Sequence, residues 1–256
     1  MQAFTQERPV QQRGRQLIID AHSLAGHGVR SPGHPFPYAD PEIILRQMDE
    51  AGIQRTIICP LENQDYAKAN EEIAEICRKY PGKFIGFARH NPETEAERIP
   101  EMLTREVREL GLKGLRITQL PPRPVLEAVS QLGIPVIYQA ERVVNLNMIA
   151  HEFPRTPFIV AHLGSYNFVW GEHIAAIDAA RRYPNVYLDT SLVGLFRFLE
   201  MAAKEAGAGK LIFGSGGPEF DSRVELHKIK LLKLSAADEA KVLSGNIQRL
   251  LPKGSI

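Results

Sequence analysis

Length, composition and charge place the chain among ordinary globular proteins. Its 256 residues are 44% hydrophobic and 24% charged, without the bias of disordered or fibrous chains. Lysine and arginine total 31 against 30 acidic residues, so neither nucleic acid nor an anionic membrane is an expected partner. The two cysteines, Cys59 and Cys77, are too few for a disulfide framework, and we expect both to be reduced and structural.

Residues 1–16 have the composition of an arm that precedes a single domain. Residues 1–16 are polar, rich in Gln and Arg, and lack the apolar stretch of a signal peptide. No apolar run approaches the ~20 residues of a membrane helix. We therefore expect an N-terminal arm over residues 1–16, one domain over residues 17–256 and a cytoplasmic location.

Short apolar, β-branched runs alternate with helical patterns along the domain, as in βαβ units around a parallel sheet. The runs are residues 17–20, 55–59, 84–87, 114–117, 135–138, 158–161, 186–189 and 210–213. A complete barrel of eight strand and helix pairs takes about 250 residues. The pattern therefore predicts an α/β fold, a (β/α)8 TIM barrel, with a doubly wound open sheet as the alternative.

Capping residues mark several helix boundaries. Asp40 followed by proline predicts a helix start, and Gly52 predicts its end. Asn70 is expected to cap a helix over residues 71–80, and Ser235 with Asp238 fits a capping box for the last helix. Residues 22–39, rich in Gly, Pro and His, are expected to form a long loop after the first strand, either a lid or a plain surface loop.

Polar residues stand where the predicted strands end, which is where a TIM barrel carries its active site. They are His22 after the first strand, Arg89 and His90 at the third, Arg116 at the fourth, Gln139 and Glu141 after the fifth, His162 after the sixth and Asp189 at the seventh. A guanidinium at the mouth suits a substrate carboxylate or phosphate, or else pairs with a nearby acidic side chain. Both interpretations stay open for the arginines.

Several of these residues lie in short segments that occur in a recognisable order. The segments are Ile19-Asp20-Ala21-His22, Tyr80-Pro81-Gly82-Lys83-Phe84, Gly114-Leu115, Ala161-His162-Leu163-Gly164, Asp189-Thr190-Ser191, Phe213-Gly214-Ser215 and Asn246-Ile247-Gln248-Arg249-Leu250. On these segments the chain resembles the amidohydrolase-related family of metal-dependent hydrolases and aromatic-acid decarboxylases, over residues 18–251. The resemblance implies a divalent metal such as zinc, a small-molecule ligand at the barrel mouth and a homo-oligomer.

The metal-binding residues of that family are incompletely matched. The resemblance places histidines at positions 24 and 139 and an aspartate at position 216, where this chain has Leu24, Gln139 and Gly216. His22 and His162 remain as metal ligands, whereas catalytic zinc usually takes three protein ligands. Either a nearby carboxylate completes the site, or the two histidines are hydrogen-bonded pocket residues.

Two functions stay open at this point. The first is a hydrolase, or a decarboxylase, of a small carboxylated, lactone or amide substrate with a degenerate metal site. In it the catalytic residues are His22, His162 and Asp189, and the substrate-binding residues are Arg116, Gln139, Glu141, Arg89 and His90. The second is a non-catalytic pseudoenzyme that binds a small ligand or a protein partner at the barrel mouth. In that case a buried Asp189 has a structural hydrogen-bonding role.

Overall fold

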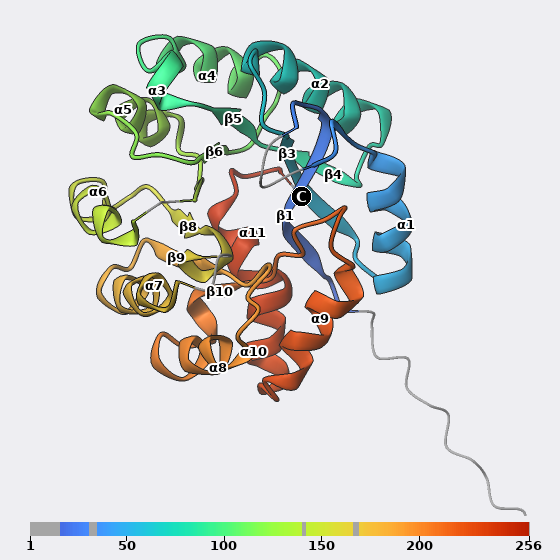
Figure 1. The fold of residues 1–256 in the computed structure, drawn as a ribbon, viewed down its shortest axis with the longest axis vertical. Helices are drawn as coiled ribbons and strands as arrows, with labels where there is room; N and C mark the ends of the chain where they lie inside the picture. The colour runs from blue at the N-terminus through green and yellow to red at the C-terminus, as the bar shows by residue number, and fades with distance from the viewer. Residues whose placement is uncertain (1–15, 31–34, 140–141, 166–168, 256) are drawn as a thin grey trace, which may run out of the picture.

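The computed structural model describes residues 16–30, 35–139, 142–165 and 169–255, in which helices surround a ring of strands (Figure 1). The strands are β1 Ile19–His27, β2 Tyr38–Ala39, β3 Arg55–Pro60, β4 Phe84–Gly86, β5 Ala88–His90, β6 Leu115–Ile117, β7 Val136–Tyr138, β8 Phe158–Val160, β9 Val186–Asp189 and β10 Leu211–Ile212. The helices are α1 Pro41–Ala51, α2 Tyr66–Lys79, α3 Pro92–Glu95, α4 Ile99–Arg108, α5 Arg123–Leu132, α6 Leu146–Glu152, α7 Trp170–Arg182, α8 Phe196–Glu205, α9 Ser222–Leu231, α10 Ala236–Ala240 and α11 Asn246–Leu250. Short helical turns are η1 Val143–Asn145, η2 Ala161–Gly164 and η3 Ala208–Lys210, and the π-helical η4 Lys241–Gly245 joins α10 to α11.

Hydrogen bonds at two seams close the strands into a barrel. At one seam, β4 and β5 are two pieces of a single strand, because Phe87 N donates to Ile58 O and Ala88 N donates to Gly114 O, each at 2.9 Å. At the other, Ala21 N donates to Phe213 O at 2.9 Å. With β2 outside the ring, eight parallel strands remain, which confirms the predicted (β/α)8 barrel and excludes the open sheet.

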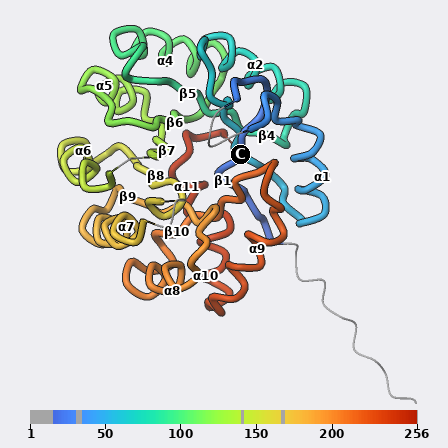
Figure 2. The backbone as a smooth tube through the Cα atoms, in the orientation of Figure 1, coloured from blue at the N-terminus to red at the C-terminus, as the bar shows by residue number. Residues whose placement is uncertain are grey.

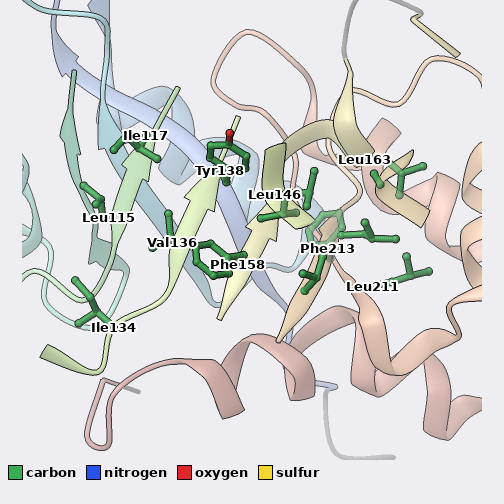
Figure 3. Packing of buried hydrophobic residues seen from close by; sticks show 14 of the residues in the cluster. Leu115, Ile117, Ile134, Val136, Tyr138, Leu146, Phe158, Leu163, Leu211 and Phe213 are labelled. Carbon is green, nitrogen blue, oxygen red and sulfur yellow. The ribbon is translucent and has the colours of Figure 1, made fainter. Parts of the chain in front are cut away.

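Alternate residues of each strand pack on opposite sides of the barrel wall. The residues inside the barrel meet Ile247 of α11 and Leu251, and α11 lies in the middle of the ring in the view of Figures 1 and 2. This interior set includes Ile19, Ile57, Ile85, Ile137, Ile159 and Ile212. The residues between the wall and the helices include Leu115, Val136, Phe158 and Leu211, which Figure 3 shows along neighbouring strands.

The helix caps agree with the sequence except at α2. The Asp40 side chain accepts a hydrogen bond from Glu42 N, and Gly52 ends α1 with a φ of 72°. Ser235 Oγ accepts from Asp238 N at 3.1 Å, as predicted. The prediction for Asn70 is wrong, because α2 begins at Tyr66. Asn70 is buried inside that helix, and its amide is used by residues of β5 and α4 instead of by the helix end.

The prediction of a long loop over residues 22–39 is also wrong at both of its ends. β1 continues to His27, and β2 pairs with it antiparallel, with Gly26 opposite Ala39 and His27 opposite Tyr38. Residues 31–34 of the predicted loop, and residues 1–15 of the predicted arm, lie outside the described residues. Both cysteines are free thiols. Among the described residues, the helices are too short or too polar for any of them to cross a membrane.

Candidate active site

The three residues predicted as catalytic lie together, with His22 in the middle of β1 and His162 and Asp189 at the carboxyl ends of β8 and β9. His22 Nδ1 is 2.7 Å from Asp189 Oδ2, and the backbone N–H of His162 donates to the same oxygen at 3.1 Å. The two imidazole rings stack, with centroids 4.8 Å apart and planes inclined by 19°. All three side chains are buried. Strands far apart in sequence thus bring two histidines and a carboxylate into contact.

The chain takes an unusual backbone conformation at the second histidine. His162 has a φ of 55° and Leu163 a φ of 52°, so both adopt the left-handed conformation that side chains other than glycine rarely take. Such a residue costs on the order of 1–3 kcal/mol and is retained where the surrounding structure holds it. Here the His162 N–H is held by Asp189, which ties the strained turn directly to the carboxylate.

Ser191 completes the hydrogen-bond network, although the sequence did not single it out. Its N–H donates to Asp189 Oδ1 at 3.0 Å and its hydroxyl donates to Asp189 Oδ2. His162 Nδ1 lies 2.9 Å from the same hydroxyl oxygen. Because the Ser191 hydroxyl donates its proton to Asp189, His162 Nδ1 is the donor to Ser191. The sequence feature that could have identified Ser191 is its position two residues after Asp189, because residues two apart in an extended strand face the same side of the barrel wall.

Charge determines which of these groups carry protons. Burial acts to raise the pKa of Asp189, but the electrostatic interaction and hydrogen bond with His22 hold it well below its usual range. Burial and, to a smaller extent, the electrostatic effects of His22 and Arg116 lower the pKa of His162 to about 3. Near neutral pH, Asp189 is therefore ionised and His162 is neutral. Since an ionised carboxylate only accepts hydrogen bonds, His22 Nδ1 carries the proton that lies between them.

His22, His162 and Asp189 are of residue types that bind metal ions, and their donor atoms all lie within 4.8 Å of one another. Such a group could hold a divalent ion. In the present arrangement, however, Asp189 Oδ2 accepts the hydrogen bond of His22 Nδ1, and a carboxylate in that position orients a metal-ligating histidine instead of serving as a ligand itself. Two imidazoles then remain, below the three protein ligands usual for catalytic zinc. The residues present do not fit a complete zinc site.

Position 216, where the resemblance implies an aspartate, is closed to a side chain. Gly216 has a φ of 71°, and a Cβ atom added there would lie 2.6 Å from Cδ2 of Leu192. Gly216 N donates to His22 O at 2.7 Å, which holds this backbone against β1. The glycine is therefore part of a close backbone approach, and an aspartate would require both Leu192 and the local backbone to move.

Two predicted substrate-binding arginines face the interior of the barrel. Arg116 of β6 is paired in register with Arg89 of β5 and with Ile137 of β7, which is an interior residue. Arg116 Nη2 donates to Gln139 Oε1, directly after β7. Neither arginine has an acidic partner within ion-pair distance among the described residues, although both are buried. The structure thus brings Arg89, Arg116 and Gln139 together.

The structure does not bring His90 to this group. Adjacent residues of a strand face opposite sides, and His90 is in register with Ile117, which packs in the cluster between the barrel wall and the helices. Its ring nitrogens lie 2.9 Å from Glu106 and 3.3 Å from Glu95. Burial acts to lower the pKa of His90, but the two carboxylates raise it to about 9. Glu141, the remaining predicted residue, lies outside the described residues.

Comparison with known proteins identifies the family. The family model described as Amidohydrolase matches residues 29–253. The chain belongs to the amidohydrolase family. This confirms the resemblance drawn from the sequence segments. The comparison with curated protein sequences gave no match.

Solved structures share the fold at low sequence identity. The 5-carboxyvanillate decarboxylase of Sphingomonas paucimobilis is 15% identical, with a TM-score of 0.71, over 92% of this chain and 98% of that one. The 2,6-dihydroxybenzoate decarboxylase of Rhizobium is 19% identical, with a TM-score of 0.69, over 92% and 98% of the two chains. A dihydroxybenzoic acid decarboxylase of Polaromonas, with bound manganese and an inhibitor, is 20% identical with a TM-score of 0.71, over 92% and 96%. These likenesses support the barrel fold.

Proposed function

We propose that this amidohydrolase-family protein hydrolyses a small carboxylated lactone or amide at the mouth of its barrel. The observation that carries the proposal is the buried pair formed by His22 and the ionised Asp189, 2.7 Å apart. A carboxylate that holds one imidazole nitrogen fixes the tautomer and leaves the other nitrogen as a base. Nδ1 of His22 faces Asp189, so Nε2 is the nitrogen available for proton transfer.

The hydrolytic step needs one proton acceptor and one proton donor, and His22 supplies both. Nε2 takes a proton from water as the water oxygen attacks the substrate carbonyl carbon. Nδ1–H stays on Asp189, whose negative charge stabilises the imidazolium. The proton then passes from Nε2 to the leaving oxygen or nitrogen as its bond to carbon breaks, which yields a carboxylic acid and an alcohol or amine. His162 and Ser191 hold Asp189 in place through their hydrogen bonds.

Recognition of the substrate carboxylate falls to Arg116 and Gln139. A planar guanidinium can donate two parallel N–H bonds to one carboxylate. Gln139 accepts a hydrogen bond from Arg116 Nη2, which restrains the guanidinium near the carboxyl end of β7. The amide also keeps the position neutral, so the charge of Arg116 is available for the substrate.

Decarboxylation is the second candidate, and it is supported by the activities named for the structural neighbours. In this chain the carbon–carbon bond to the carboxylate would break, carbon dioxide would leave, and His22 would deliver a proton to the carbon that remains. The Polaromonas neighbour contains manganese. A dependence on added manganese therefore separates this route from hydrolysis by His22 and Asp189 alone.

The test is turnover of a panel of carboxylated lactones, amides and aromatic carboxylic acids, before and after treatment with a chelator. Hydrolysis that persists after chelation is expected. His22→Gln should abolish it, whereas His27→Gln, an exposed histidine on the same strand, should retain it. Absence of turnover together with absence of saturable binding refutes the proposal. Saturable binding without turnover supports the pseudoenzyme instead, and activity lost on chelation and restored by manganese overturns metal independence.

A further inference from the structure

Arg89 and Arg116 place two guanidinium groups beside each other inside the barrel. The residues are register partners on β5 and β6, and neighbouring strands in a sheet lie about 4.8 Å apart. Their side chains are only 7% and 5% exposed. Two positive charges are thus buried on adjacent strands, on the same side of the barrel wall.

Both guanidinium groups extend toward the barrel mouth. Arg89 Nη1 donates to the carbonyl oxygen of Pro60, the last residue of β3, at 3.2 Å. Arg116 Nη2 donates to the side chain of Gln139, the residue that follows β7. In a TIM barrel the carboxyl ends of the strands form the catalytic face. The two charges therefore lie at the end of the barrel that also holds His22 and His162.

Most of the donor capacity of these two groups is unused. A guanidinium has five N–H donors, and each of these two guanidinium groups makes a single hydrogen bond among the described residues. Nε of Arg89, and Nε and Nη1 of Arg116, are buried without a partner. Burial and the charge of Arg116 lower the pKa of Arg89 to about 10, so Arg89 remains charged at neutral pH. An uncompensated buried charge is strongly destabilising. A bound anion would compensate both charges.

The protein holds Arg89 firmly in this unfavourable position. Asn70 Oδ1 accepts from Arg89 N at 2.9 Å, and Asn70 Nδ2 donates to Arg89 O at 3.2 Å and to Glu106 Oε1 at 2.8 Å. The guanidinium carbon lies 5.6 Å from the centroid of the Tyr66 ring. The buried amide of Asn70 thus fixes the backbone of Arg89, and the Tyr66 ring lies beside its guanidinium, as expected of a preorganised binding site.

We propose that Arg89 and Arg116 form a subsite for a doubly charged oxyanion group on the substrate, either a phosphate monoester or two adjacent carboxylates. One oxyanion group between the guanidiniums supplies acceptors for the unpartnered N–H donors and balances both charges. The assignment of this group to a substrate rests on the proposed hydrolase function, whereas the binding itself does not. A substrate with one carboxylate would leave one buried charge unbalanced.

Binding is tested by calorimetry with three probes at about pH 8, where phosphate is largely dianionic. Inorganic phosphate and phthalate represent the two kinds of doubly charged group, and benzoate is the singly charged control. We expect saturable binding of phosphate or phthalate, and the preferred one identifies the source. Arg89→Met and Arg116→Met should each weaken it about 30-fold or more, while Arg108→Met, an exposed arginine of α4, should leave it unchanged.

Thermal denaturation of the same proteins gives a second readout that a damaged fold would not reproduce. Without an anion, Arg116→Met should melt at a higher temperature than the wild type, because an unpaired buried charge has been replaced by an apolar side chain. With phosphate or phthalate the order should reverse, since only the wild type is stabilised by binding. If a variant fails to fold, saturable stabilisation of the wild type by a dianion, beyond that by chloride at equal ionic strength, still tests the subsite.

The outcomes separate the subsite from the proposed function. Benzoate bound as tightly as phthalate and phosphate, or binding unchanged in both arginine variants, overturns the subsite. Dianion binding that needs both arginines, with no turnover of any panel substrate, supports the subsite and refutes the hydrolase. Turnover that depends on His22 but is insensitive to both arginine substitutions leaves the hydrolase and overturns the subsite.

Discussion

Replacing Glu106 with glutamine removes the more buried of the two carboxylates that keep His90 protonated. In the folded protein, burial acts to lower the pKa of His90, but Glu106 and Glu95 raise it from 6.5 to about 9. That difference corresponds to about 3 kcal/mol of folding free energy. Because the folded pKa is the higher one, this stabilisation is fully present below about pH 6.5 and is lost as the pH rises through about 9.

Glu106→Gln should therefore flatten the dependence of stability on pH. The amide can still hydrogen-bond Asn70 and His90, but it carries no charge to favour the imidazolium. The advantage of the wild type over the variant should be largest near pH 6 and shrink by up to about 3 kcal/mol by about pH 9.5. Urea denaturation across this range measures it. Lys210, whose pKa burial lowers to about 8, titrates with the opposite sign, so only differences between variants are interpreted.

The matched control is Glu101→Gln, an exposed glutamate on the same helix, α4. Its curve of stability against pH should run parallel to that of the wild type. If the Glu106→Gln curve also runs parallel to the wild type, then His90 is neutral in the folded protein, and the argument from its two carboxylate partners is wrong.

Three other substitutions test the site and its supports. Asp189→Asn should lower turnover by about 10³- to 10⁴-fold while the circular dichroism spectrum is kept, since an amide cannot hold the same tautomer of His22 as the carboxylate does. Gly216→Ala should reduce the free energy of unfolding, measured in urea, by about 1–3 kcal/mol. The reduction should be smaller in a Leu192→Ala background, because that substitution removes the clash. Equal reductions in both backgrounds would contradict this. Asp40→Ala should cost about 1 kcal/mol in the same assay through the lost N-cap, and no loss would show that water replaces it.

The strands were predictable because continuous apolar runs are typical of strands covered on both faces. The exceptions have local causes. The second half of β1 pairs with β2 in a segment that is rich in glycine and proline. This segment lacks the apolar alternation of a strand, so the pairing of Gly26 with Ala39 could not be predicted from the sequence. Asn70 is a favoured capping residue, but its amide is used across space by Arg89 and Glu106, which adjoin it only in the fold.

The site was predictable to the extent that strand ends converge in a barrel. That rule brought together His22, His162 and Asp189, which lie on three separate strands. It did not distinguish Arg89 from His90, although a strand period of two already requires them to face opposite sides. Arg89 is in register with Arg116 and His90 with Ile117, and this pairing between strands cannot be obtained from the sequence of one strand alone.

The three departures from the family's ligand set are each built into this chain's own packing. Leu24 packs against the interior cluster of the barrel, Gln139 holds Arg116, and Gly216 lies against Leu192. Each of these positions therefore makes a packing or hydrogen-bond contact of its own. Arg89 and Arg116 bring buried positive charge to the barrel interior, and such charge repels a divalent cation and attracts an anion. In the proposed subsite, Gln139 connects the two features, because it stands where the resemblance implies a histidine and it accepts a hydrogen bond from Arg116.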